Sequence, residues 1–187
     1  MADNHTSTGQ IPIRTRIRLF LLLVPAVFFL DFLTKKLVQS YLEPYGQTIE
    51  LIQHVARFRF IYNQGIAFGI DPGIFSGWLL VLFSAAAALV LTWYVFTGRI
   101  DDLPSLAALC LIVAGAFGNL YDRLLYGRVV DFIEIGIKDF TWPVFNVADI
   151  AVTAGAVLLA FRLLAGKPPG TAESSDRSNS PGETQEN

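Results

Sequence analysis

Four long apolar stretches constrain the fold of this chain more than any other feature of its sequence. They run over residues 19–34, 74–96, 103–121 and 142–164. A helix that crosses a bilayer needs about 20 mostly apolar residues; the last three stretches meet that length, and the first is slightly shorter. Only 16% of the residues are charged, whereas soluble domains have about a quarter, and the mean hydropathy is +0.49. The sequence therefore predicts an integral membrane protein with four transmembrane helices.

The first apolar stretch follows Arg14, Arg16 and Arg18, which is the basic flank typical of a secretory signal peptide. No small-residue cleavage site follows it, and the chain continues as an amphipathic segment, so we interpret it as a retained helix. The basic residues outside the spans divide equally between the two sides of the membrane. Because the first helix usually sets the topology, its three arginines favour a cytoplasmic N-terminus and, after four spans, a cytoplasmic C-terminus.

The two long loops, over residues 37–73 and 124–141, then fall together on the extracytoplasmic side. The first contains the alternation Arg57-Phe58-Arg59-Phe60, which has the two-residue period of a half-buried strand, and residues 128–135 form a second β-rich run. We therefore expect a mainly α membrane protein, with four transmembrane helices and a small extracytoplasmic antiparallel β-segment that rests on the membrane. This membrane domain spans residues 17–166. The polar residues 1–16 and the Pro-, Gly-, Ser- and Glu-rich residues 167–187 are expected to be disordered cytoplasmic tails.

Ionisable groups inside apolar stretches are costly and indicate function. Three clusters have helical spacing: Asp31, Thr34 and Lys35; Gly115, Gly118, Asn119, Asp122 and Arg123; and Asn146, Asp149 and Thr153. Each cluster also has a structural interpretation. Asp31 and Lys35 can form an ion pair that anchors a helix end. Asp122 and Arg123 can form a surface pair beside a glycine packing seam, and Asp149 can be a carboxylate at a helix N-terminus.

A further carboxylate, Asp131, ends a β-like run and lies, like Asp149, near one membrane surface. Two such groups can share a proton, so that one acts as a base on water and the other as an acid. The only histidines are His5 and His54, and Cys110 is the only cysteine. The sequence therefore offers no Ser-His or Cys-His pair and no zinc site. Its net charge of −2 gives no basic excess for nucleic acid.

Five sequence blocks carry a family resemblance. They are Asp31-x-x-Thr34-Lys35, Asn63-Gln64-Gly65-Ile66-Ala67-Phe68, Gly115-x-x-Gly118-Asn119-x-x-Asp122-Arg123, Gly127-Arg128-Val129-Val130-Asp131-Phe132 and Asn146-x-x-Asp149. In this order, between four spans, they resemble the lipoprotein signal peptidases (type II signal peptidases), which are integral membrane aspartyl proteases of bacteria. The resemblance covers residues 17–164.

The resemblance implies that Asp131 and Asp149 are a catalytic dyad. It implies further site residues that line or support the dyad: Asp31, Lys35, Asn63, Gly115, Asn119, Asp122, Arg123 and Asn146. It places Gly65, Ala67 and Phe68 in the β-segment over the cleft, and it implies no metal or cofactor.

The substrate that the resemblance implies is a prolipoprotein whose lipobox cysteine carries diacylglyceryl and is cleaved just before that cysteine. The enzyme is then expected in the bacterial cytoplasmic (inner) membrane, with its active site near the extracytoplasmic surface. It is expected to be a monomer in contact with lipid, to bind no nucleic acid, and to be inhibited by cyclic peptides that mimic the lipobox.

Two other functions compete with this interpretation. A metal-dependent CDP-alcohol phosphotransferase fits Gly127-x-x-x-Asp131, but Ile135 stands where its next aspartate belongs, and Arg123 follows Asp122 where a glycine belongs. A proton-coupled carrier with Asp31 and Asp149 as relay groups leaves the surface-loop carboxylate unexplained.

Overall fold

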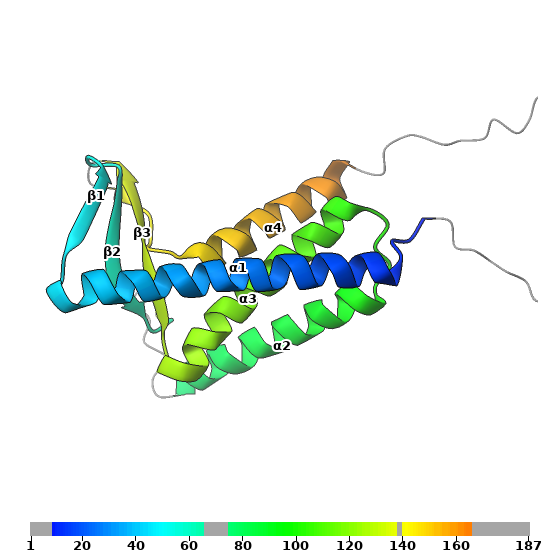
Figure 1. The fold of residues 1–187 in the computed structure, drawn as a ribbon, viewed down its shortest axis with the longest axis horizontal. Helices are drawn as coiled ribbons and strands as arrows, with labels where there is room; N and C mark the ends of the chain where they lie inside the picture. The colour runs from blue at the N-terminus through cyan, green and yellow to red at the C-terminus, as the bar shows by residue number, and fades with distance from the viewer. Residues whose placement is uncertain (1–8, 66–74, 138–139, 166–187) are drawn as a thin grey trace, which may run out of the picture.

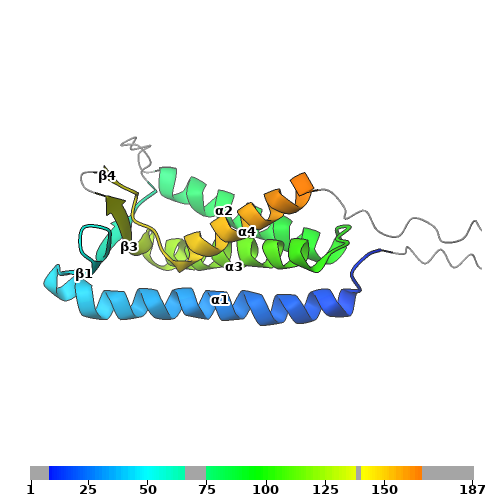
Figure 2. The ribbon, with the colours of Figure 1, turned by 90° about the horizontal axis from the view of Figure 1, so that it is seen from above.

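The protein is described by a computed structural model that covers residues 9–65, 75–137 and 140–165. Its four long helices are α1 (Ile13–Leu42), α2 (Phe75–Thr97), α3 (Leu103–Tyr126) and α4 (Val147–Ala165). Each contains a segment long and apolar enough to cross a membrane. Helix α3 lies at the centre and packs against the other three, as Figures 1 and 2 show. The prediction of four membrane helices is confirmed.

A small antiparallel sheet stands across one end of the bundle (Figure 1). Its strands are β1 (Thr48–Ile52), β2 (Ala56–Asn63), β3 (Val129–Ile137) and β4 (Phe140–Thr141), in the order β1-β2-β3-β4. A short 3-10 helix, η1 (Glu43–Tyr45), connects α1 to the sheet. Strand β3 follows α3 directly, through Gly127 in the left-handed conformation with φ 67°, and it pairs with β2 so that Asn63 lies opposite Val129. The predicted β-segment is therefore confirmed, and it closes over the ends of α3 and α4.

Helix α1 is longer than the apolar stretch that predicted it, and it begins inside the segment expected to be disordered. Arg16 accounts for the early start, because it is only 4% exposed. Its guanidinium donates to the carbonyls of Ile11 (2.9 Å), Val95 (3.2 Å) and Gly98 (2.5 Å). These bonds fix the start of α1 against the end of α2. The expectations for residues 1–8 and 166–187 lie outside the described residues.

Helix α4 begins at Val147, later than the apolar stretch that starts at Trp142. The intervening residues pair with β3 instead: the Trp142 amide donates to Ile135 (2.8 Å), and the Phe145 amide donates to Ile133 (3.0 Å). An apolar segment satisfies its backbone polar groups equally well in a sheet or a helix. The pairing with β3 therefore decides where α4 starts.

Two glycines of α3 allow α4 and α1 to approach closely. A Cβ atom on Gly115 would collide with the carbonyl oxygen of Ala148, and one on Gly118 would lie 2.6 Å from Asp31 Oδ2 and 3.1 Å from the Ala148 Cβ atom. Such small residues let helix backbones come together inside a membrane. They bring the N-terminus of α4 beside the polar residues of α1.

Candidate active site

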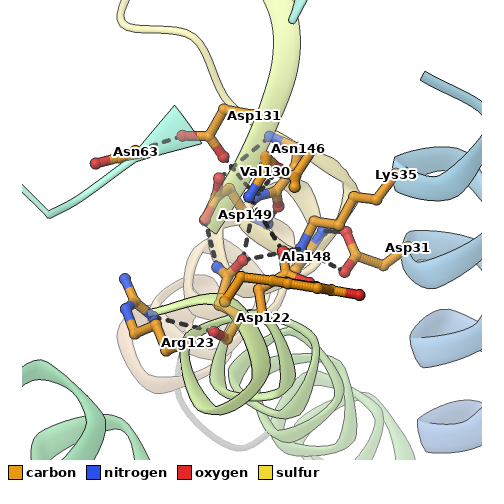
Figure 3. A network of polar contacts seen from close by, with 12 residues as sticks. Asp31, Lys35, Asn63, Asp122, Arg123, Val130, Asp131, Asn146, Ala148 and Asp149 are labelled. Carbon is orange, nitrogen blue, oxygen red and sulfur yellow. Dashed lines mark hydrogen bonds and ion pairs between the residues drawn. The ribbon is translucent and has the colours of Figure 1, made fainter. Parts of the chain in front are cut away.

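Asp131 and Asp149 come from separate elements and meet at Asn146 (Figure 3). Strand β3 carries Asp131, and the first turn of α4 carries Asp149. The Asn146 side-chain amide donates to Asp131 Oδ1 (2.6 Å), and its backbone amide donates to Asp149 Oδ2 (3.1 Å). One residue therefore contacts both carboxylates and holds them at the junction of the sheet and the bundle.

The contact between Asn146 and Asp149 is also a helix cap. The Asn146 Oδ1 atom accepts a bond from the Asp149 amide (2.9 Å), while Asp149 accepts from the Asn146 amide. This reciprocal pattern is a capping box, so the structural interpretation of Asp149 holds in part. Its other oxygen, Oδ1, accepts a bond from the Asn119 side chain of α3 (2.8 Å). Asp149 is therefore fixed by two elements while its side chain stays partly accessible.

Asp131 is more deeply buried, with only 1% of its surface exposed. Besides the bond from Asn146, it accepts one at Oδ2 from the side-chain amide of Asn63 on β2 (2.9 Å). Asn63 is oriented by its own oxygen, which accepts from the Gly65 amide (2.7 Å). Burial raises the pKa of Asp131 to about 6, and the nearby charge of Asp149 acts in the same direction, whereas the amide hydrogen bonds oppose it. A carboxyl group with such a pKa can exchange a proton near neutral pH.

Behind the pair, Lys35 of α1 is buried with 3% of its surface exposed. Its ammonium group lies 2.7 Å from Asp31 Oδ2 and 2.9 Å from Asp122 Oδ2, and it donates to Asn119 Oδ1 (3.2 Å). The ion pair expected between Asp31 and Lys35 is present, but it lies in the interior and not at an exposed helix end. The sequence position of Asp122 suggests a pair with the adjacent Arg123. In the structure Asp122 pairs instead with Lys35, across two helices.

The two acidic members of this cluster also hold the backbone elements that carry the pair. Asp31 Oδ1 accepts the amide hydrogen of Ala148 in the first turn of α4 (2.8 Å). Asp122 Oδ2 accepts that of Val130, the residue before Asp131 in β3 (3.1 Å). The cluster thus positions α4 and β3 relative to α1 and α3.

Arg123 lies on the side of α3 that faces α2. Its Nη1 atom donates weakly to Ser84 Oγ of α2 (3.4 Å) and to the Asn119 carbonyl (3.5 Å), and no ion pair within 4.0 Å is found for it among the described residues. Ser84 could not be predicted as a neighbour of the site, because nothing in the apolar pattern of α2 distinguishes it from the other small polar residues there. Ala67 and Phe68, assigned to the cleft by resemblance, lie outside the described residues.

The side chains of the described residues include no group of three His, Cys, Asp or Glu placed to share one metal ion. Asp131 and Asp149 instead have amide hydrogen-bond donors on both of their oxygens. This arrangement holds two carboxylates in a fixed geometry, which suits proton transfer to and from a third group.

Comparisons with known proteins agree with the residue blocks that predicted this site. A family model described as signal peptidase (SPase) II matches residues 23–165. A lipoprotein signal peptidase of Pseudoalteromonas atlantica is 38% identical over 152 residues, which are 79% of this chain and 90% of that protein. One from Francisella tularensis subsp. novicida is 33% identical over 150 residues, or 79% and 91% of the two chains. Two solved structures of bacterial membrane enzymes, determined by the in meso method, have the same fold. Their TM-scores are 0.70 and 0.68 at 28% and 30% identity, and they cover 88% and 83% of this chain and 98% and 96% of their own.

Proposed function

Because the chain belongs to the signal peptidase II family, we propose that Asp131 and Asp149 are its catalytic pair. As a member of that family it is an aspartic peptidase of the bacterial inner membrane that removes signal peptides from prolipoproteins. The observation that carries the assignment of the pair is the shared contact with Asn146, which brings the two carboxylates together from β3 and α4.

In the proposed reaction the pair activates a water molecule against the scissile carbonyl carbon. Asp131, whose pKa burial raises to about 6, carries the shared proton, and Asp149, the more accessible of the two, takes a proton from the attacking water. The proton held by Asp131 then passes to the leaving amine as the carbon–nitrogen bond breaks. Two carboxylates in different surroundings can divide the acid and base roles in this way.

The neighbouring side chains act as positioning residues in this mechanism. Asn63, Asn119 and Asn146 orient the carboxylates through amide hydrogen bonds. Lys35, with its two acidic partners, fixes the strand and the helix that carry the pair. Arg123 contributes positive charge on the α2 side of the site.

The placement of the site at one end of the bundle supports the substrate and the orientation that we propose. The starts of α1 and α3 and the end of α4 lie at the opposite end from the sheet (Figure 1). With the termini in the cytoplasm, the catalytic pair lies at the extracytoplasmic surface, where a peptide meets water while its acyl chains remain in lipid. We therefore propose a prolipoprotein substrate with a diacylglyceryl-modified lipobox cysteine, cut just before that cysteine. The enzyme acts as a monomer, and lipobox-mimicking cyclic peptides inhibit it.

The test replaces each carboxylate of the pair by its amide. Asp131→Asn and Asp149→Asn should each lower the cleavage rate of a diacylglyceryl-modified lipobox peptide in detergent by at least about 10³-fold, or about 4 kcal/mol. The double variant should be little worse than either single variant, because the two groups act as a unit.

Asp102→Asn is the matched control, since Asp102 caps the opposite end of α3 and bonds to Ser105 and Arg162 there. It should leave the rate within about twofold, which is under ~0.5 kcal/mol. If Asp149→Asn kept more than about a tenth of the wild-type rate, a loss under ~1.4 kcal/mol, the assignment of the pair would have to be abandoned. An unmodified peptide should be cut far more slowly than the lipidated one, because each buried methylene contributes about 0.8 kcal/mol.

A further inference from the structure

An apolar groove with a volume of about 510 Å³ runs between α1 and α3. Its walls include Val24, Phe28 and Phe29 of α1 and Phe117, Leu120 and Leu124 of α3. None of these residues belongs to the catalytic pair or to the cluster around Lys35. The groove opens along helices that cross the membrane, so a hydrocarbon chain is the occupant that its surroundings provide.

An aromatic series leads from this groove towards the extracytoplasmic end of α1. Phe28 and Phe32 are stacked with ring centroids 6.5 Å apart, and Tyr121 of α3 meets both rings edge-on at 5.6 Å. The series ends at Lys36, whose ammonium group lies 5.9 Å from the centre of the Phe32 ring and 5.1 Å from that of Tyr126. The groove therefore has an apolar floor and a cationic mouth.

The charge at this mouth is not neutralised by the protein in the described part of the chain. Lys36 is exposed and donates to the Tyr126 hydroxyl (2.8 Å), and no carboxylate oxygen of residues 9–65, 75–137 or 140–165 lies within 4.0 Å of it. A second cation, Arg128, stacks 3.4 Å from the centre of the Tyr62 ring, and its buried Nε atom has no hydrogen-bond partner among the described residues.

Arg128 is linked to α1 through Tyr62, because Gln39, three residues after Lys36, donates to the Tyr62 hydroxyl (3.3 Å). That hydroxyl in turn donates to Glu43 (2.8 Å). Among the described residues neither Lys36 nor Arg128 forms an ion pair, and such cations are complementary to an anionic phosphate group.

The distance along α1 from the far end of the groove to Lys36 is close to the depth of one membrane leaflet. Lys36 lies twelve residues after Val24 on the same helix, a rise of about 18 Å at ~1.5 Å per residue. Half of the hydrocarbon core of a bilayer is about 15 Å thick. An acyl chain that starts at the level of Lys36 therefore ends near Val24.

We propose that the groove and its mouth bind one anionic glycerophospholipid of the outer leaflet. Its phosphate contacts Lys36, and one acyl chain fills the space between Phe29 of α1 and Leu120 of α3. The bound lipid holds α1 against α3, which is the packing that brings Lys35 to Asp122. The groove residues include neither carboxylate of the catalytic pair, so the test of this proposal does not depend on the catalytic assignment.

The experiment measures retention of defined lipids by the purified, detergent-solubilised full chain, using native mass spectrometry. Phosphatidylglycerol and phosphatidylcholine with identical acyl chains are titrated separately. Wild type should retain phosphatidylglycerol more tightly. Lys36→Gln should weaken the binding of phosphatidylglycerol about fivefold, as expected for one basic residue near the membrane surface. It should leave the retention of phosphatidylcholine unchanged. Arg18→Gln is the matched control, because Arg18 is also exposed on α1 but lies at its cytoplasmic end. This variant should retain both lipids as tightly as wild type.

A second variant and a labelling experiment test the acyl chain. Leu124→Trp fills the groove from an exposed position (61% exposed) and should weaken the binding of both lipids. Phosphatidylglycerol with a photoreactive acyl chain should label peptides of α1 and α3 that contain Phe29 and Leu120, and Lys36→Gln should reduce that labelling. Three results would each overturn the proposal. They are equal retention of the two lipids by wild type, unchanged retention of phosphatidylglycerol by Lys36→Gln, and labels spread evenly over all four helices.

Discussion

Replacing Asp31 separates the structural role of the buried cluster from a direct role in catalysis. This carboxylate is 1% exposed and makes two contacts. It pairs with Lys35 at 2.7 Å and accepts the amide hydrogen of Ala148 at the start of α4 (2.8 Å). Asp31→Ala removes both contacts, whereas Asp31→Asn keeps an oxygen for the Ala148 amide and removes the charge.

The expected costs follow from these contacts. Loss of one partner of a buried ion pair costs about 3–5 kcal/mol. Since Lys35 keeps Asp122 and Asn119 as partners, we expect the loss of its pair with Asp31 to cost an amount at the lower end of that range. The uncapped Ala148 amide adds about 1 kcal/mol. We therefore expect Asp31→Ala to lower the free energy of unfolding by about 4 kcal/mol, and Asp31→Asn by about 2 kcal/mol, as for a lost hydrogen bond to a charged group.

The assay is equilibrium unfolding of the purified variants in mixed micelles with a denaturing detergent, beside the cleavage rate of the lipidated peptide in mild detergent. Activity should follow stability, so that Asp31→Asn retains more of both than Asp31→Ala. The control Glu50→Gln changes an exposed carboxylate of β1 and should stay within about 0.5 kcal/mol of wild type. A variant Asp31→Ala with wild-type stability and a strongly reduced cleavage rate would refute this reasoning, because it would mean that Asp31 acts on the substrate.

Three further predictions concern the site and the sheet. Because burial raises the pKa of Asp131 from 3.8 to about 6, the folded state binds more protons than the unfolded state between these values. Stability should therefore fall by about 3 kcal/mol as the pH rises through this window; Asp131→Asn should flatten that part of an unfolding-versus-pH curve. Gly118→Ala, whose Cβ atom would lie 2.6 Å from Asp31 Oδ2, should cost about 1–3 kcal/mol by overpacking in the same unfolding assay and should also slow cleavage. Glu134→Gln removes the charge of the ion pair between the buried Glu134 and the partly exposed Arg57 (2.6 Å), which holds the pKa of Glu134 below its usual range; limited proteolysis should then cut the β1–β2 hairpin faster than in wild type.

The sequence by itself determined the membrane architecture. Long apolar stretches in lipid must satisfy their backbone hydrogen bonds internally and therefore form helices. The alternation of Arg57, Phe58, Arg59 and Phe60 likewise predicted a strand, since side chains alternate across a sheet. Local spacing was also sufficient for the ion pair between Asp31 and Lys35, because residues four apart lie on one face of a helix.

Only the tertiary structure decided the contacts between elements. Asp122 pairs with Lys35 and not with Arg123, because adjacent helical residues point in different directions and cannot face each other. The start of α4 depends on pairing between residues 142–145 and β3, which no local pattern reports. The meeting of Asp131 and Asp149 at Asn146 depends on the closure of the sheet over the helix ends. Local preference determines each helix and strand. The side chains that complete the hydrogen bonds of the Asp131 and Asp149 carboxylates come from elements distant in sequence. The approach of those elements depends on packing around Gly115 and Gly118.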